Sequence, residues 1–223
     1  DNVSRAVDLA FIRIDFTPKT NLSFGKLCAD WGGYEFDFNP IDILTYNDVL
    51  EFADNFMVGA GIAHTFNDGK NSISFQVLNS RNKTYEEQYG SSAPPSIKPS
   101  EFPLAFVANW RGSFFGGKFE TTYSYSFFNE AKSAQMNYFA LGNKFKAKKI
   151  IVYYDFKYSA EDLDRKGIIS TIVSGQYPYA AENTLYVENW VRAEYSVTPK
   201  FNLLLTVMNS KHSWKANSDP NAK

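Results

Sequence analysis

Residues 149–159 read Lys-Ile-Ile-Val-Tyr-Tyr-Asp-Phe-Lys-Tyr-Ser, and their side chains alternate between two kinds with a period of two. A period of two places alternate side chains on opposite faces of a β-strand. One face carries an apolar set that ends in aromatics: Ile150, Val152, Tyr154, Phe156 and Tyr158. The other face carries charges of both signs and comprises Ile151, Tyr153, Asp155, Lys157 and Ser159. A soluble sandwich or barrel would bury the apolar face, whereas a transmembrane barrel would turn it to lipid and the charged face to a wet lumen.

The composition excludes two classes of protein. The chain has 223 residues, with 23 Lys and Arg against 24 Asp and Glu, so it carries no basic footprint for nucleic acid. No run of 18 or more apolar residues occurs, which excludes a helical membrane span. A mean hydropathy of −0.35 is still compatible with a membrane barrel, because its alternating strands average out to a polar-looking chain. Nothing resembles a linker, so we expect one domain over residues 1–223.

The connections between the expected strands carry the topology. Alternation recurs along the chain and indicates about ten strands of roughly 9–12 residues, long enough to cross a bilayer at a tilt. Short turns are expected at residues 17–21, 67–70, 111–117, 146–148 and 198–200. The connections that alternate with them are mostly long and lie at residues 28–56, 81–102, 129–135 and 159–183, the first with a short helix near residues 48–53. In an up-and-down meander this order places all short turns at one rim and the long loops at the other, which is typical of outer-membrane barrels. A Greek-key sandwich has no reason to produce it.

Aromatic residues of the apolar set cluster beside the short turns. They are Phe16, Phe66, Phe119, Phe145, Tyr195 and Phe201. Rings of aromatics at the membrane interface are expected of such barrels, although strands favour aromatics in any setting. The sequence therefore predicts an all-β, antiparallel up-and-down transmembrane barrel. The alternative is a soluble β-barrel or sandwich that binds a small ligand.

Several short runs resemble one family. Residues 24–26, 30–35, 39–41 and 75–81 read Phe-Gly-Lys, Asp-Trp-Gly-Gly-Tyr-Glu, Asn-Pro-Ile and Phe-Gln-Val-Leu-Asn-Ser-Arg. Together they resemble outer-membrane porins of the phosphate-selective porin O and P type, most closely over residues 6–81. The resemblance implies a homotrimer in the outer membrane of a Gram-negative bacterium, with roughly 16–18 strands in each barrel. Because about ten strands are expected here, we expect strands to be missing at both ends.

Charged residues of the polar parity are the candidates for the lining of a pore. They are Arg13, Asp15, Lys118, Glu120, Lys144, Asp155, Lys157, Glu188, Arg192 and Glu194. Rings of side-chain charge select ions in pores, but charges of mixed sign also cross-link a wall as ion pairs. Since the acids match the bases in number, no strong phosphate filter is evident.

The loop at residues 28–56 is the candidate for a constriction folded into the pore. Its candidate residues are Asp30, Tyr34, Glu35 and Asp37. The acids Asp30, Glu35, Asp37, Asp42 and Asp48 make the loop acidic. An acidic constriction argues against simple anion selection. The alternative is an external cap that contacts a neighbouring protomer.

The sequence offers few candidate catalytic residues. His64 and His212 are the two histidines, and no Cys or His cluster has metal-ligand spacing, so no metal and no cofactor is expected. His64 has the outward parity while Ser72 and Ser74 have the inward one, which separates any nucleophile and base. We therefore expect a non-enzymatic porin that contacts outer-membrane lipid, binds no nucleic acid, and passes small hydrophilic solutes or ions, including anions such as phosphate.

Overall fold

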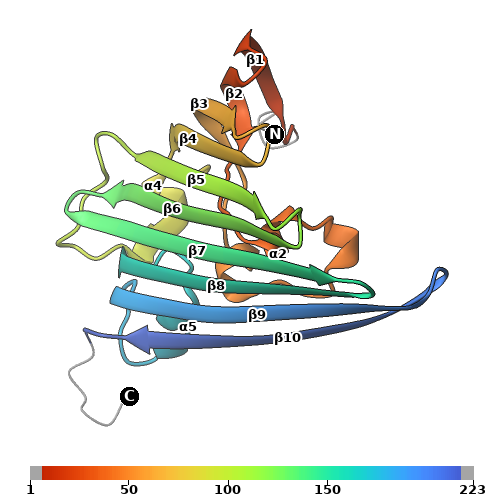
Figure 1. Cartoon of the computed structure of the whole chain (residues 1–223). Helices are drawn as coiled ribbons and strands as arrows, with labels where there is room; N and C mark the ends of the chain where they lie inside the picture. The colour runs from red at the N-terminus through yellow and green to blue at the C-terminus, as the bar shows by residue number, and fades with distance from the viewer. Residues whose placement is uncertain (1–6, 217–223) are drawn as a thin grey trace.

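The computed structural model describes residues 7–216, which form one ten-stranded antiparallel sheet whose strand order follows the chain (Figure 1). The strands are β1 (Ala10–Thr17), β2 (Thr20–Cys28), β3 (Phe56–Phe66), β4 (Asn71–Asn79), β5 (Leu104–Phe114), β6 (Phe119–Ala131), β7 (Ala134–Ala147), β8 (Ile150–Leu163), β9 (Glu182–Thr198) and β10 (Phe201–Trp214). Each strand pairs with its neighbours in sequence, which confirms the predicted meander. Within residues 7–216, β1 and β10 do not pair with each other, so this sheet is open.

The short turns lie where the sequence predicts them, within a few residues. The turn between β3 and β4 has Asn67 and Asp68 at φ 50° and 52°, followed by Gly69 at φ 83°. Asn, Asp and Gly are the residues that adopt this left-handed conformation most readily, which is why the sequence marks the turn so clearly.

Three boundaries were predicted wrongly, and in each case a polar segment continues a strand. The predicted connection at 129–135 is a tight turn at residues 132–133, because β6 and β7 pair as far as Ala131 and Ala134. The predicted turn at 111–117 begins after Phe114, and the predicted loop at 159–183 begins after Leu163. The cause is shared: polar side chains on these segments lie on the inner face of the sheet, where polarity does not signal a loop.

Short helices occur in the three long loops. They are α2 (Tyr34–Asp37), η1 (Pro40–Asp42) and α3 (Asp48–Glu51) between β2 and β3, α4 (Tyr85–Tyr89) and η2 (Gly90–Ser92) between β4 and β5, and α5 (Ile168–Val173) between β8 and β9. The position of α3 confirms the helix predicted near residues 48–53. No helix within residues 7–216 has both the length and the apolar character needed to span a membrane.

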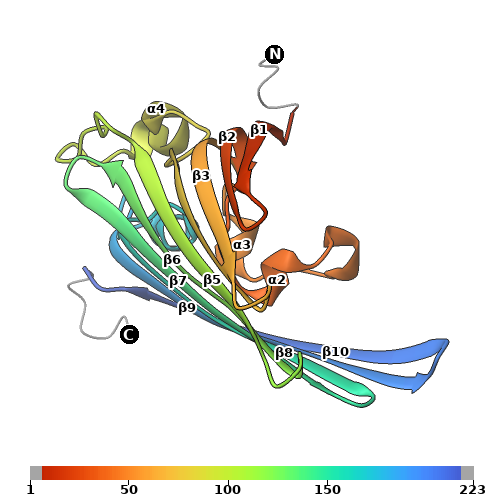
Figure 2. The same cartoon turned by 45° about the horizontal axis from the view of Figure 1, so that its top comes forward.

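The two faces of the sheet differ in a way that decides between the alternatives. On β8, Ile150 and Tyr154 from the apolar set are 45% and 39% exposed, whereas Asp155 and Lys157 from the polar set are fully buried. The loops cause this burial, because segments that join the strands lie against the inner, polar face (Figure 2). A soluble barrel or sandwich would bury the apolar set, so the structure gives it no support.

The aromatics predicted for the interface lie at the ends of strands beside the short turns. Phe16, Phe145 and Phe201 are more than half exposed on the apolar face. Rings in this position suit the boundary between lipid tails and water.

Candidate functional site: a loop bound to the polar face

The loop at residues 28–56 is bound to the polar face of the sheet, first through Asp155. This buried carboxylate on β8 accepts the backbone N–H groups of Tyr34 (2.9 Å) and Glu35 (2.7 Å) at the start of α2. The approach requires Gly33, whose φ is +86° and where a Cβ atom would lie 2.9 Å from Asp155 Oδ2. A side chain at this position would be strained and would also collide with the anchor.

A buried ion pair forms the second anchor. Lys157 Nζ bonds to Glu35 Oε2, and both side chains are fully buried. The other oxygen of Glu35 accepts the backbone N–H of Asn47 at 2.7 Å, so the carboxylate also holds the two ends of the loop's inner segment together. Such a pair offsets the desolvation of both charges only while both partners are present.

Arg111 on β5 is the third anchor, and the sequence had placed it in a turn. Its guanidinium donates to Asp30 (2.9 Å) and to Asp37 (2.5 Å). Asp30 also accepts from Asn109 Nδ2 at 3.0 Å and from Ser74 Oγ at 2.7 Å. Three of the acids that make the loop acidic, Asp30, Asp37 and Glu35, are therefore paired with cations of the wall.

Tyr34 packs against the wall at β7 and β8. Its ring packs edge-on against Tyr153 at 5.4 Å between centroids, and Lys144 Nζ lies 5.9 Å from the ring centre. Lys144 in turn pairs with Glu120 at 2.8 Å. Burial raises the pKa of the Tyr34 phenol, with further contributions from Glu120 and Asp37, so the phenol stays protonated and can donate a hydrogen bond.

The far part of the loop is bound to β9. Glu188 Oε1 accepts the backbone N–H of Val49 at 2.9 Å. Arg192 donates to the backbone oxygen of Asp42 (2.6 Å) and to Glu194 (2.7 Å), and its guanidinium lies 4.1 Å from the centre of the Phe38 ring. Planar cations stack well on aromatic rings, so this contact adds to the hydrogen bonds.

The remaining candidates lie apart from this loop. Arg13 and Asp15 pair with each other at 2.8 Å on β1, where both are exposed. Lys118 is exposed beside the turn between β5 and β6. The structure thus brings the four loop candidates together with Glu120, Lys144, Asp155, Lys157, Glu188, Arg192 and Glu194, and it separates them from the other three. A role of the whole set in lining a pore stays a prediction.

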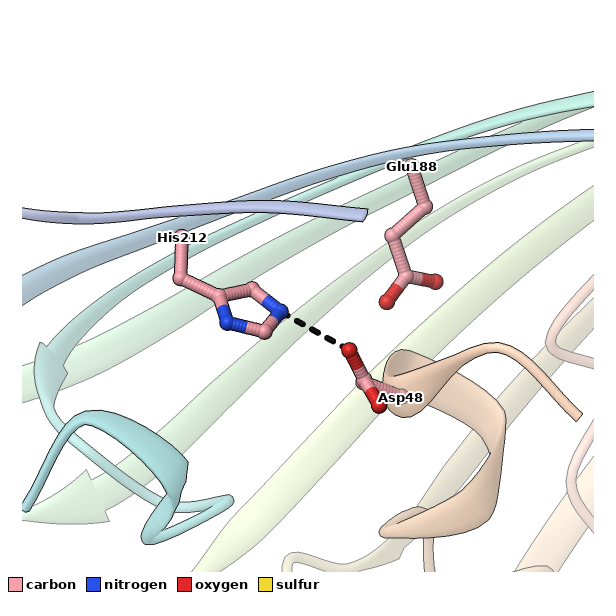
Figure 3. Close-up of side chains that lie close together, drawn as sticks. All are labelled: Asp48, Glu188 and His212. Carbon is pink, nitrogen blue, oxygen red and sulfur yellow. Dashed lines mark hydrogen bonds and ion pairs between the residues drawn. The ribbon is translucent and has the colours of Figure 1, made fainter. Parts of the chain in front are cut away.

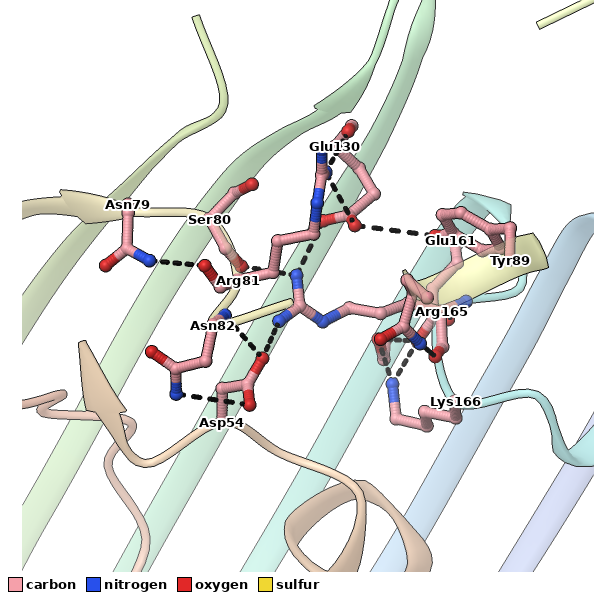
Figure 4. A network of polar contacts seen from close by, with 12 residues as sticks. Asp54, Asn79, Ser80, Arg81, Asn82, Tyr89, Glu130, Glu161, Arg165 and Lys166 are labelled. Atoms are coloured by element: carbon pink, nitrogen blue, oxygen red, sulfur yellow. Dashed lines mark hydrogen bonds and ion pairs between the residues drawn. The ribbon is translucent and has the colours of Figure 1, made fainter. Parts of the chain in front are cut away.

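A buried polar network joins the long loops at the end of the strands away from the short turns, and sequence analysis missed it (Figure 4). Glu130 on β6 pairs with Arg81 (3.1 Å) from the loop after β4 and with Arg165 (2.5 Å) from the loop after β8. Arg165 also pairs with Asp54, at 2.8 Å, at the end of the first long loop. The partners lie 35 to 111 positions apart in the sequence, so no local pattern could reveal them.

Similarity to one solved outer membrane channel supports the fold. The chain is similar to the outer membrane channel DcaP of Acinetobacter baumannii, with a TM-score of 0.53 and 11% identity over 91% of this chain and 55% of that one. It is also similar to OmpT of Vibrio cholerae, as a loop L8 deletion mutant, and to OccK8 (OprE) of Pseudomonas aeruginosa. Their TM-scores are 0.46 and 0.41, each at 10% identity, covering 88% and 86% of this chain and 72% and 50% of theirs. The chain thus spans about half the length of the DcaP chain.

A search of curated proteins found no match. The family described as phosphate-selective porin O and P matches residues 1–217 and so covers nearly the whole sequence. This match confirms the resemblance carried by the short runs in residues 24–81. The chain belongs to the phosphate-selective porin O and P family and is a protein of the Gram-negative outer membrane.

Proposed function

We propose that this protein forms a water-filled channel that passes small hydrophilic solutes or ions across the outer membrane by passive diffusion, without a catalytic step. One observation carries the proposal: a long loop is bound to the polar face of a sheet whose other face is apolar and exposed. A strand with an apolar outer face and a polar inner face is the wall of a membrane pore. A loop on the inner side narrows such a pore, and this favours a constriction over an external cap.

The constriction that we propose is formed by Asp30, Tyr34, Glu35 and Asp37, with the charged residues of the polar face lining the channel beside them. The loop acids meet Arg111 and Lys157, so their charge is largely balanced by the wall. A balanced constriction selects weakly by charge. We therefore propose weak ion selectivity, with anions such as phosphate among the solutes.

The wall must be closed for such a channel to exist in lipid. An open sheet leaves unpaired backbone N–H and C=O groups along both edge strands, and lipid offers them no partner. We propose that further strands complete one barrel domain that includes residues 1–223, and that the loops at 28–56, 81–102 and 159–183 belong to its extracellular side. We also propose assembly into a homotrimer, as the family resemblance implies.

Conductance tests the channel directly. The full-length protein is purified in detergent and added to a planar bilayer under a salt gradient. We expect stepwise conductance with a small reversal potential, whose sign reports whether bases or acids dominate. A heat-stable, detergent-requiring β-protein without conductance would refute the open channel.

A variant with a shortened loop distinguishes a constriction from an external cap. Replacement of residues 36–46 by a short Gly-Ser linker removes the middle of the loop, including Asp37, and leaves the strands unchanged. A constriction predicts a larger unitary conductance for this variant. An external cap predicts an unchanged conductance, and that result would refute the assignment of the loop.

A further inference from the structure

Three side chains that are remote in sequence converge on the polar face, near the long loops (Figure 3). Asp48 begins α3 in the first long loop, Glu188 lies on β9 and His212 lies on β10. One ligand atom from each lies within 4.8 Å of the other two. His212 Nε2 and Asp48 Oδ2 are 2.8 Å apart and form a hydrogen bond.

The sheet register explains why two of these residues meet. Glu188 pairs with Ser210, and His212 is the next residue on the same face of β10, so the two are diagonal neighbours on adjacent strands. Asp48 is held near them by its neighbour Val49. The backbone N–H of Val49 donates to Glu188 Oε1 at 2.9 Å and so fixes the start of α3 against the wall.

The burial of Glu188 is a second feature of this cluster. Glu188 is fully buried; its Oε1 accepts from Val49 N–H and Ser210 Oγ, whereas its Oε2 has no hydrogen-bond partner within residues 7–216, and Lys157 and Lys166 stabilise its charge. A buried carboxylate oxygen without a partner is costly, and native structures rarely retain one. Figure 3 shows one oxygen of the Glu188 carboxylate facing Asp48 and His212 and the other turned away from them.

We propose that Asp48, Glu188 and His212 bind one divalent cation of the zinc class. An imidazole nitrogen with carboxylate oxygens suits Zn²⁺, whereas Ca²⁺ and Mg²⁺ favour sites made of oxygen alone. Zn²⁺ takes both ligand types at about 2.0–2.2 Å, and atoms already within 4.8 Å of one another reach that geometry through small side-chain rotations.

Charge and access fit the same ion. Two carboxylates balance the charge of a divalent cation, and a water completes the tetrahedron. The nearby Lys157 and Lys166, which also act on Glu188, are paired with Glu35 and Glu161. The side chains of His212 and Asp48 are 24% and 36% exposed, so an ion can enter from solvent.

The bound ion would link α3 to β9 and β10 and so fix the first long loop to the wall. This inference does not depend on the solute that the channel passes. The two proposals are tested separately, because metal binding is measured without conductance. A protein that fails to bind zinc can still conduct, and a protein that fails to conduct can still bind zinc.

Zinc binding to the detergent-purified full-length protein tests the proposal. The parent and all variants carry Cys28→Ser, because this exposed thiol could bind zinc by itself. We expect about one Zn²⁺ per chain, and at least about 100-fold weaker binding after Asp48→Asn, Glu188→Gln or His212→Gln, since loss of even an outer-shell partner costs 10–100-fold. The matched control is His64→Gln, a histidine of β3 bonded to Thr20 and outside the cluster, which should bind as the parent does. Absence of zinc from the parent, or equal binding by all four variants, would overturn the proposal.

X-ray absorption of the zinc-loaded parent gives a readout that needs no ligand variant to fold. We expect one imidazole nitrogen and two or more oxygens at about 2.0–2.2 Å. A coordination shell with sulfur, or with two imidazoles, would contradict the assignment to these three residues.

Discussion

The loop depends most directly on Asp155, so replacing this residue gives the sharpest test of how the loop is held. Asp155→Ala removes the acceptor of two backbone N–H groups, at 2.9 and 2.7 Å, from the start of α2. A hydrogen bond to a charged group contributes about 1.5–3 kcal/mol, so the two together stabilise the bound loop by about 3–6 kcal/mol. Asp155→Asn keeps one acceptor oxygen and should cost about half as much.

These energies convert into a change in how often the loop leaves the wall. Each 1.4 kcal/mol is a tenfold change in an equilibrium, so Asp155→Ala should raise the detached fraction on the order of 100-fold or more, and Asp155→Asn about tenfold. Cleavage by a protease tracks the open population when opening and closing are fast. Chymotrypsin cleavage after Phe36, which is packed against the core in the bound loop, therefore measures the effect.

The control for this experiment is Asp15→Ala, because Asp15 has the same polar parity but is exposed on β1 and pairs with Arg13. We expect its cleavage rate to match the unmutated protein. Conductance recorded in parallel should show larger fluctuations for Asp155→Ala than for the control. A cleavage rate after Phe36 within threefold of the unmutated rate would refute the reasoning, because the carboxylate would then contribute little to holding the loop.

Three further predictions address the backbone, the rim network and the outer face. Gly33→Ala should destabilise the bound loop by about 1–3 kcal/mol through backbone strain and so raise the rate of chymotrypsin cleavage after Phe36. Gly175→Ala, where an added Cβ meets nothing within 4 Å, should leave that rate unchanged. Glu130→Gln leaves two buried guanidinium groups without their shared carboxylate and should lower the unfolding free energy in denaturant titrations by about 3–5 kcal/mol; a loss below about 1 kcal/mol would show that the network is dispensable. Leu141→Arg, in the middle of β7, should cost about 2–4 kcal/mol of folding free energy in lipid vesicles, against about 0–1 for Phe145→Arg near the turn, and equal costs would contradict a lipid-facing strand.

The period-two pattern predicted the strands and their faces because it depends on neighbouring residues alone. Residues 149–159 illustrate this: the parity that separates Tyr154 from Asp155 is the parity that separates the exposed face from the buried one. The alternation of turn lengths extended this local information to topology. The pattern did not show that the charged face is covered, because that depends on a loop more than 100 residues away in sequence.

Strand ends were predicted poorly for a related reason. Arg111, Glu130 and His212 are polar residues near strand ends, and sequence analysis placed Arg111 in a turn and Glu130 in a connection. In a soluble sheet a polar run marks the surface. In this sheet polar residues belong inside, so polarity carries no information about where a strand stops. The site residues that were missed are therefore concentrated at these ends.

The inverted arrangement of polar and apolar residues also determines how the loop is held. Its entry is packed in the usual way, with Trp31 stacked on Phe128 at 5.3 Å and set edge-on to Tyr138 at 6.1 Å. Beyond that point the wall offers mainly charges and hydroxyls, so the loop is held by buried ion pairs and charge-assisted hydrogen bonds. Such contacts are directional, and removing one partner leaves the other buried and unpaired in a medium of low polarity. A hydrophobic core tolerates a lost methylene by partial collapse, but a polar anchor such as Glu35 with Lys157 does not. The position of the loop is therefore expected to respond to single substitutions at a few charged residues far more than to changes in its apolar ones.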